Sequence, residues 1–306
     1  MKIIFFLIGS ILFSDLPAQL PAISTGALHR HENFPSRYVT PRHIDVWTPE
    51  GYDSRKKYAV LYMHDGQMLY DSNSSWNRQS WEIDETTGKL MQEKEVQDFI
   101  IVGIWNSGAG RHSDYFPQKP FENLTIKEKE QVFSAYRGNG NAVFKEPRLL
   151  SDNYLRFIVE ELKPFIDSSY ATLQKRKYTM IAGSSMGGLI SLYAICEYPE
   201  IFGGAACLST HWPGIFSMEN NPVPDALFRY LKEKLPSPRN HKLYFDHGDA
   251  SLDSLYPPLQ QKADLIIQSK GYRSRNWQTR NFPGENHSET AWRKRVHLPL
   301  LFLFGK

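Results

Sequence analysis

The sequence predicts an α/β fold in which a mostly parallel, doubly wound sheet is flanked by helices. Short apolar stretches of strand length alternate with longer stretches of helical periodicity along the chain. Each parallel crossover needs about a dozen residues or more, and the segments between the expected strands supply them. The 306 residues are 41% hydrophobic, which is enough apolar material for one sizeable core. We therefore expect one domain over residues 24–306.

Three strands are expected in the first third of the chain. Residues 42–48 alternate polar and apolar side chains, and residues 58–63 are nearly all apolar, as in an inner strand covered on both faces. Residues 99–105 form a third run. The Gly-rich, polar segment 107–143 then predicts a lid or specificity loop whose shape the sequence leaves open. The segment before residue 50 is a candidate for further strands.

The alternation continues to the end of the chain. The apolar positions of residues 154–166 fall on one helical face. Further strands are expected at 178–182, 204–208, 242–245 and 276–281, and further helices at 186–198, 258–269 and 290–304. In such a sheet the chemistry belongs at the carboxyl ends of the strands.

Residues 1–23 differ from everything after them. Lys2 supplies a positive charge, and residues 3–13 form an uncharged apolar run, well short of the ~20 residues of a spanning helix. This pattern predicts a signal peptide, with possible cleavage after Ala18 or Ala22, and export to the periplasm or the extracellular space. The alternative is an uncleaved apolar segment that anchors or packs.

Charge and cysteine content exclude little but point to no macromolecular partner. The 36 basic and 33 acidic residues are interspersed and give a net charge of +3, so the charge identifies no partner. We expect no nucleic-acid partner and no stable membrane span in the mature protein. Cys196 and Cys207 are the only cysteines. Export would permit a disulfide, but two buried free thiols are expected. The oligomeric state is left open.

The strongest chemical signal lies between the expected strand 178–182 and the helix after it. Residues 183–188 read Gly-Ser-Ser-Met-Gly-Gly, which places Ser185 at the centre of a G-x-S-x-G nucleophile elbow. Such a turn needs glycines for space, and it leaves the hydroxyl exposed at a helix N-terminus. Ser184 is the off-centre competitor, and an ordinary Gly-rich turn is the non-catalytic alternative.

A serine nucleophile needs a base, and in this architecture the order along the chain is Ser, acid, His. Five of the ten histidines follow Ser185. His287 lies in a polar loop between the last expected strand and helix, where it can reach a neighbouring strand end, and is the predicted base. His211 and His247 also follow strands and can line the site. The alternative for His287 is a solvated loop histidine.

The acid is expected after the strand 242–245. Asp246 lies at the end of that strand, and Asp249 and Asp253 lie in the loop beyond Gly248. Asp253 is favoured because it shortly precedes a helix and Asp249 suits the turn itself. The acid would hold the His287 tautomer and stabilise the imidazolium without taking the proton.

Two backbone N–H groups are expected to hold an oxyanion. Met186 offers one at the start of the helix after the elbow. The other is assigned to Gln67, because His64-Asp65-Gly66-Gln67 follows an inner strand and Gly66 lets the backbone pass close to the nucleophile. A tight turn with no catalytic part is the alternative.

These motifs together resemble a known family. His-Asp-Gly-Gln at 64–67, Gly-Ser-Ser-Met-Gly-Gly at 183–188, Leu-Ser-Thr-His-Trp-Pro at 208–213, Leu-Asp at 252–253 and Asn-His at 286–287 are similar to the esterase family. That family includes enterochelin (siderophore) esterases, esterase D, feruloyl and acetyl-xylan esterases and mycolyltransferases. The resemblance runs through about residues 35–304.

The resemblance implies an α/β-hydrolase fold and a triad of Ser185, Asp253 and His287. The acid loop has two more residues between Gly248 and Asp253 than the feruloyl branch usually has, which keeps Asp249 open. The family spans several substrates, and no stretch of this sequence identifies one.

Residues that follow strands are candidates for the mouth of the site. Trp105, His211 and Trp212 would suit a phenolic acyl group, a catecholate or a sugar ring, and Arg111 would meet an anionic group, with ordinary loop packing as the alternative for all four. We therefore predict a serine carboxylic-ester hydrolase acting on a siderophore-type or carbohydrate-linked ester, with no metal or organic cofactor. The expected partner is a small-molecule or carbohydrate ester as the substrate. An acyltransferase with the same triad and a non-catalytic binding protein are the rival functions.

Overall fold

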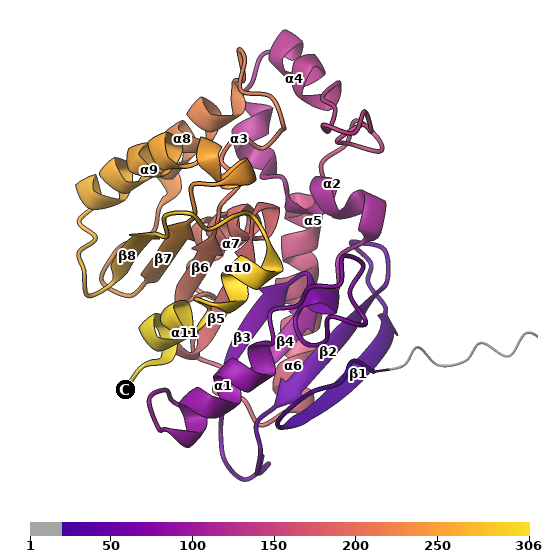
Figure 1. Ribbon diagram of the computed structural model, residues 1–306, viewed down its shortest axis with the longest axis vertical. Coiled ribbons are helices and arrows are strands. Elements are labelled where there is room, and N and C mark those ends of the chain that lie inside the picture. Colours follow the sequence, from indigo (N-terminus) through magenta and orange to yellow (C-terminus); the bar gives the residue numbers. More distant parts are fainter. Residues whose placement is uncertain (1–19) are drawn as a thin grey trace, which may run out of the picture.

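A computed structural model describes residues 20–306 of the chain (Figure 1). Eight strands form one sheet in the order β1-β2-β4-β3-β5-β6-β7-β8. The strands are β1 (Ala27–Phe34), β2 (Arg42–Thr48), β3 (Ala59–His64), β4 (Phe99–Ile104), β5 (Thr179–Ser184), β6 (Gly204–Leu208), β7 (Lys242–His247) and β8 (Trp277–Asn281). β1 and β2 pair antiparallel with each other and β2 with β4, whereas all other neighbours are parallel. The predicted mostly parallel sheet is confirmed.

Helices cover both faces of this sheet. The helices are α1 (Ile83–Gln92), α2 (Arg111–Tyr115), α3 (Gln118–Glu122), α4 (Ile126–Phe133), α5 (Ser151–Arg156), α6 (Lys163–Ser169), α7 (Met186–Glu197), α8 (Val223–Lys234), α9 (Pro257–Ser269), α10 (Glu289–Arg293) and α11 (His297–Phe304). A π-helical segment, Phe157–Leu162, joins α5 to α6. Short 3₁₀ segments are η1 (Gly66–Met68), η2 (Gly108–Gly110), η4 (Arg176–Tyr178) and η5 (Ser251–Leu255).

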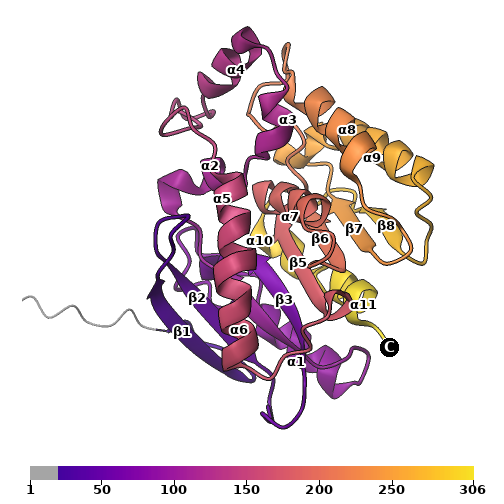
Figure 2. The same ribbon diagram turned by 180° about the vertical axis from the view of Figure 1, so that it is seen from behind.

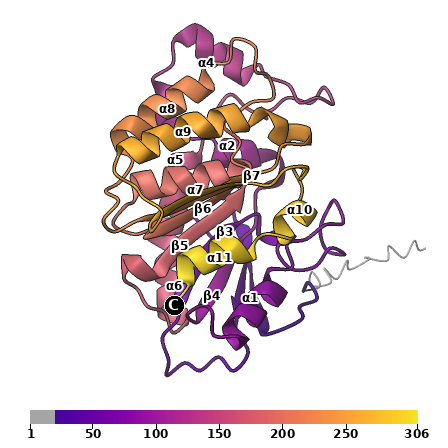
Figure 3. The ribbon, with the colours of Figure 1, turned by 60° about the vertical axis from the view of Figure 1, so that its left-hand side comes forward.

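The two faces of the sheet bury two separate apolar clusters. On one face α1 and α11 pack side chains such as Ile83 and Leu300 against the inner strands (Figure 1). On the other face the run from α5 to α6, together with α7, packs side chains such as Leu155 and Ile190 (Figure 2). Figure 3 shows the sheet lying between these two helical layers. Inner strands β3 and β4 are buried along their whole length because both of their faces are covered.

The register of the parallel strands aligns the loops that follow them. Ser184 at the end of β5 pairs with Leu208 of β6, Leu208 pairs with Asp246 of β7, and Asp246 pairs with Arg280 of β8. The segments after β5, β6, β7 and β8 therefore start side by side at the carboxyl end of the sheet.

The structure differs from the sequence prediction chiefly near the C-terminus. One helix was expected over 290–304, but α10 and α11 are separate. Proline lacks an N–H and clashes inside a helix, so it is tolerated only in a first turn. Pro299 accordingly lies in the first turn of α11, which begins anew at His297.

Other differences concern segments whose shape was left open, and the helices α1 and α8 were not predicted. The segment before residue 50 does add a strand, β1, and the expected loop 107–143 contains α2, α3 and α4. Cys196 and Cys207 are both free and buried, as predicted. Residues 1–19, which carry most of the predicted signal peptide, lie outside the described residues. Within residues 20–306 no helix is both long enough and apolar enough to cross a bilayer.

Candidate active site

Ser185 lies in a sharp turn between β5 and α7. Its backbone has φ 58° and ψ −122°, a conformation that L-residues rarely adopt and that costs on the order of 1–3 kcal/mol. The turn is held by the Ser185 N–H, which donates to the Leu208 carbonyl at 2.9 Å. A Cβ on Gly183 would lie 2.8 Å from the carbonyl carbon of Gly187, so glycine is required where strand and helix meet. The result is a partly exposed serine at the start of a helix.

His287 and Asp253 meet in the loops that follow β8 and β7. The His287 Nδ1 lies 2.5 Å from the Asp253 Oδ1, and the Asp253 side chain is fully buried. A carboxylate can only accept, so Nδ1 carries the hydrogen and Nε2 is left with a free lone pair. This is the tautomer that a general base toward a serine hydroxyl requires.

The second oxygen of Asp253 has its own donors. Its Oδ2 accepts from the Ser209 hydroxyl at 2.6 Å and from the Gly248 N–H at 2.7 Å. Burial acts to raise the pKa of Asp253, but the hydrogen bonds from His287, Ser209 and Gly248 outweigh it and lower the pKa below its ordinary value. The carboxyl is therefore held as a carboxylate.

Ser209 connects the acid to a buried ion pair. Its hydroxyl accepts from the Trp292 Nε1 at 2.9 Å and from an Arg295 guanidinium nitrogen at 3.1 Å. Arg295 in turn pairs with Asp246 at 3.0 Å. Burial raises the pKa of Asp246, and Arg295 acts against that rise. Asp246 is thus tied to Arg295, and it contacts the acid only through Ser209.

Asp249, the alternative acid, holds the backbone of the loop. Its side chain is exposed, and its Oδ1 accepts from the Gly284 N–H at 2.6 Å. The structure therefore places Asp253, and not Asp249, against the imidazole of His287.

The loop after β3 lies against the start of α7. A Cβ on Gly187 would be 3.4 Å from the His64 Cβ, which places the His64–Gln67 loop beside the Ser185 turn. A Cβ on Gly66 would be 2.7 Å from the carbonyl carbon of Gly103, so only glycine fits there. Gln67 and Met186 are each in the first turn of a helical segment, where backbone N–H groups have no intrahelical acceptor. Both expected oxyanion donors thus occupy neighbouring segments.

The Arg111 side chain forms an ion pair with Asp65 of this loop and is only partly exposed to solvent. Its Nε and one terminal nitrogen each lie 2.7 Å from an oxygen of Asp65, in a two-point ion pair. The Asn106 side-chain amide donates to the same carboxylate at 2.7 Å. Burial acts against the charge of Arg111, but the pairing with Asp65 raises the pKa of Arg111. The side chain remains 28% exposed, so part of the guanidinium stays accessible.

The three other residues expected at the mouth of the site have different surroundings. His211 lies at the site, because its backbone N–H donates to the backbone carbonyl of Ser185 at 3.1 Å. Trp105 lies beside Gly66, but its Nε1 donates to Asp45 at 2.7 Å in a separate network. Trp212 is fully buried and packs against Phe245 in the core. Trp212 therefore does not reach the mouth of the site, since its ring fills the space under α9 and is held by Gln260.

Sequence reasoning missed Tyr256, which lies at the end of η5. Its hydroxyl is 2.8 Å from the His211 Nδ1, and its ring meets the His287 ring edge-on with centroids 5.8 Å apart. Burial raises the pKa of Tyr256, and a hydrogen bond with the Ser185 side chain acts against that rise. Only its position three residues after Asp253 could have pointed to it.

A family model described as "Putative esterase" matches residues 36–298. The "Ferri-bacillibactin esterase BesA" of Bacillus subtilis (strain 168) is 27% identical over 177 residues, which is 56% of this chain and 54% of that protein. The chain spans about half the length of the curated relatives it matches.

Solved structures share the architecture at low sequence identity. A BES protein from Bacillus cereus superposes with a TM-score of 0.64 at 17% identity, covering 95% of this chain and 100% of the other. A ferulic acid esterase gives a TM-score of 0.63 at 17% identity, covering 92% and 99%. These likenesses show the fold, which is that of the α/β hydrolases.

Proposed function

Because the chain belongs to the "Putative esterase" family, we propose that it is a carboxylic-ester hydrolase that works through a covalent acyl-enzyme on Ser185. The observation that carries the proposal is the 2.5 Å contact between His287 Nδ1 and a buried Asp253. It lies at the carboxyl end of the sheet, where the aligned strands also present the strained Ser185 turn.

The first half of the reaction forms the acyl-enzyme. His287 Nε2 takes the proton of the Ser185 hydroxyl as Oγ attacks the carbonyl carbon of the ester. The carbonyl oxygen becomes an oxyanion, which the N–H groups of Met186 and Gln67 stabilise. When the tetrahedral intermediate collapses, the protonated His287 gives its proton to the leaving alcohol. Asp253 stabilises the imidazolium throughout and keeps its own charge.

The second half releases the acid. A water molecule attacks the acyl carbonyl while His287 Nε2 takes one of its protons. The same two N–H groups hold the second oxyanion. Collapse frees the carboxylic acid and returns the proton to the Ser185 oxygen. In this scheme His287 carries out every proton transfer.

The substrate class we propose is an ester of a phenolic or hydroxylated group, of siderophore or carbohydrate-linked type. The surroundings of Ser185 support it, because Tyr256 and His211, although both buried, place rings with polar atoms beside Ser185. Phe216 lies against the His211 ring at 5.1 Å. Relatives carry the names ferri-bacillibactin esterase and ferulic acid esterase, which describe those two chemistries.

The experiment uses the purified chain with p-nitrophenyl acetate and butyrate, and with methyl ferulate and ferric enterobactin in parallel. Ser185→Ala is expected to abolish hydrolysis while circular dichroism and unfolding remain those of the folded protein. Ser184→Ala is the matched control, since it removes the neighbouring hydroxyl from the same turn, and it should retain activity. Full activity in Ser185→Ala would refute the mechanism. Products formed with an added alcohol acceptor measure how far transfer competes with hydrolysis.

A further inference from the structure

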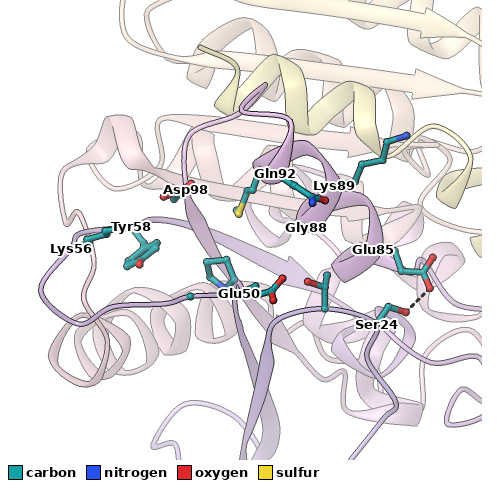
Figure 4. Close-up of a pocket in the computed structure, with 13 residues that line it drawn as sticks. Ser24, Glu50, Lys56, Tyr58, Glu85, Gly88, Lys89, Gln92 and Asp98 are labelled. Carbon is teal, nitrogen blue, oxygen red and sulfur yellow. Dashed lines mark hydrogen bonds between the residues drawn. The ribbon is translucent and has the colours of Figure 1, made fainter.

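Two large cavities open at the amino end of the sheet, opposite the Ser185 loops. One has a volume of about 590 Å³ and lies between α1 and the segments that precede β3 and β4 (Figure 4). Its lining carries both signs of charge, with Glu50, Glu85 and Asp98 facing the same cavity as Lys56 and Lys89 (Figure 4). Because acidic and basic side chains line the same cavity, their charges offset each other. The charge of this cavity therefore indicates no class of ligand.

The second cavity, which we call the basic groove, is lined by charged side chains of one sign only. It has a volume of about 780 Å³ and is lined by four lysines and three arginines, with no Asp or Glu. Most of these cations come from the loops before β5, β7 and β8 and from the last residue: Lys175, Arg176, Lys177, Arg239, Arg275 and Lys306. The groove thus concentrates positive charge far beyond the net charge of +3 of the whole chain.

The cations of the basic groove are unpaired among residues 20–306. None of them forms an ion pair with a carboxylate there, although Arg111, Arg293 and Arg295 elsewhere all do. The seventh cation, Lys242, donates to the carbonyl oxygens of Phe302 and Leu303 at 3.0 and 3.3 Å. Like charges gathered in one hollow repel each other and destabilise the fold slightly, and a bound anion would remove that repulsion.

A buried histidine, His241, forms part of the lining of the groove. Both ring nitrogens of His241 lie 2.8 Å from a carbonyl oxygen, Nδ1 from Ser237 and Nε2 from Pro199. Contacts with these two backbone carbonyl groups hold the ring in the floor of the groove.

We propose that the basic groove binds a chain-like polyanion that carries phosphate or sulfate groups. Arginine forks and lysine ammonium groups are the side chains that recognise such oxyanions. A groove lined over three loops fits several anions in a row, and a single small anion would leave most of its cations unused. Of the apolar side chains in the lining, Met180, Leu303 and Phe304 are buried and Pro238 is half-buried.

That burial argues against two other polyanions. A bilayer surface is flat and cannot reach the recessed His241 and Lys242, and no exposed apolar side chain of the lining is available to insert. A single-stranded nucleic acid needs exposed rings on which its bases stack, and the rings of Phe304 and His241 in the lining are both buried.

The groove is an anchoring site and not part of the site around Ser185. β5 separates the two, and its six residues span roughly 20 Å at about 3.3 Å per residue. A bound polyanion therefore leaves Ser185 accessible. The inference stands independently of the ester hydrolysis proposed above, because none of its residues belongs to that site.

The test measures binding of the full chain to fluorescein-labelled heparin oligosaccharide and to long-chain inorganic polyphosphate by fluorescence anisotropy. The groove variant is Lys175→Gln/Lys177→Gln/Arg275→Gln, whose three side chains are exposed. The matched control is Lys232→Gln/Lys262→Gln/Arg229→Gln, which removes the same charges from the exposed faces of α8 and α9. p-Nitrophenyl acetate hydrolysis and circular dichroism report folding in both variants.

We expect the groove variant to bind at least about tenfold more weakly than the unmodified chain, and the control to stay within about twofold. The slope of log affinity against log salt, measured between about 50 and 200 mM NaCl, should become shallower by roughly two in the groove variant alone. Preference for polyphosphate or for heparin tells phosphate from sulfate chemistry. Equal loss in both variants, or no binding at the higher salt, would overturn the proposal. So would groove-dependent binding to phosphatidylglycerol vesicles without binding to either soluble polyanion.

Discussion

Ser209 and Asp253 lie 44 residues apart in the chain and are joined by a buried 2.6 Å hydrogen bond. Ser209 has φ 43°, a conformation that serine adopts rarely, and this places its hydroxyl between Asp253 on one side and Trp292 and Arg295 on the other. The acid therefore contacts His287 with one oxygen and is fixed through the other.

Replacing Ser209 should disturb this arrangement without touching the substrate. Ser209→Ala removes a donor from Asp253 and the acceptor of a buried Trp292, which costs about 1–3 kcal/mol of unfolding free energy. We expect kcat to fall about tenfold with KM little changed, since a positioning group acts on the chemical step. Ser209→Gly relieves the backbone strain and should recover stability but not kcat. Urea unfolding and ester kinetics measure the two effects, and a recovery of kcat in the glycine variant would contradict the assigned role.

The two candidate acids give a matched pair of variants. Asp253→Asn keeps the shape but no longer fixes the Nδ1–H tautomer of His287, and we expect kcat to fall by roughly 10³–10⁴. Asp249→Asn changes an exposed side chain whose contact is with the Gly284 N–H, and should stay within about fivefold of the unmodified chain. If the two losses were reversed, Asp249 would be the acid.

Tyr256→Phe tests the residue that sequence reasoning missed. The buried His211 Nδ1 would lose its partner, at a cost of about 1–2 kcal/mol in unfolding free energy. We expect kcat to fall by less than about tenfold, because the proposed mechanism assigns the proton transfer to His287 and not to Tyr256. A fall of more than about 10²-fold, the scale of general acid–base catalysis, would give Tyr256 a part in proton transfer.

Gly248 leaves no room for a side chain beside the acid. A Cβ there would lie 2.0 Å from the Glu285 carbonyl oxygen and 3.2 Å from the Asp253 Oδ2. Gly248→Ala should therefore push apart the loops that carry Asp253 and His287, with a loss of more than about 2 kcal/mol in unfolding free energy and of most activity. Gly138→Ala is the control, since a Cβ at Gly138 meets nothing within 4 Å. Equal thermal unfolding of the two variants would contradict this account.

Buried histidines predict how stability depends on pH. Burial, with Arg137 and Arg111 nearby, lowers the pKa of His112 to about 3, although the Gly214 carbonyl acts against that change. In the unfolded chain the pKa is about 6.5, so between these values the unfolded state binds a proton that the folded state does not. Stability contributed by the neutral form is thus present above about pH 6.5 and is lost as pH falls, by up to about 1.4 kcal/mol per pH unit.

His112→Gln removes this pH-dependent contribution to stability and can keep the hydrogen bond to the Gly214 carbonyl. Urea unfolding at pH 7, 6 and 5 should give a shallower pH dependence in this variant by about 1 kcal/mol per unit near pH 5. His29→Gln, on the exposed strand β1, is the control and should leave the slope unchanged. An unchanged slope in His112→Gln would show that His112 takes up its proton in the folded state.

The sequence predicted the parts of the fold that local pattern determines. The apolar runs of β3, β4 and β6 and the apolar face leading into α6 were predicted within one to three residues. The elbow around Ser185 was equally clear, because its glycines are needed locally. The break before α11 was missed although Pro299 marks it, since the apolar pattern of that segment continues through the break.

Contacts between loops that are far apart in the chain could not be predicted from the sequence. Asp253 and Asp249 have the same chemistry and lie four residues apart, so only the path of the chain after Gly248 separates them. Trp212 follows a strand as His211 does, and both side chains are buried. The chain turns at these residues, and the Trp212 ring packs against Phe245 in the core. Tyr256 carried no motif at all and reaches Ser185 only through the turn of η5.

The strand that leads to His287 also borders the sheet. Among residues 20–306, β8 pairs with β7 alone, so one row of its backbone N–H and C=O groups faces outward. Such a row is a template on which a second chain can add a strand and begin to aggregate. The exposed, charged side chain of Arg280 on this edge strand disfavours such pairing. Engineering of this chain for new substrates should therefore keep Arg280, because an apolar residue there would invite intermolecular pairing directly beside the histidine loop.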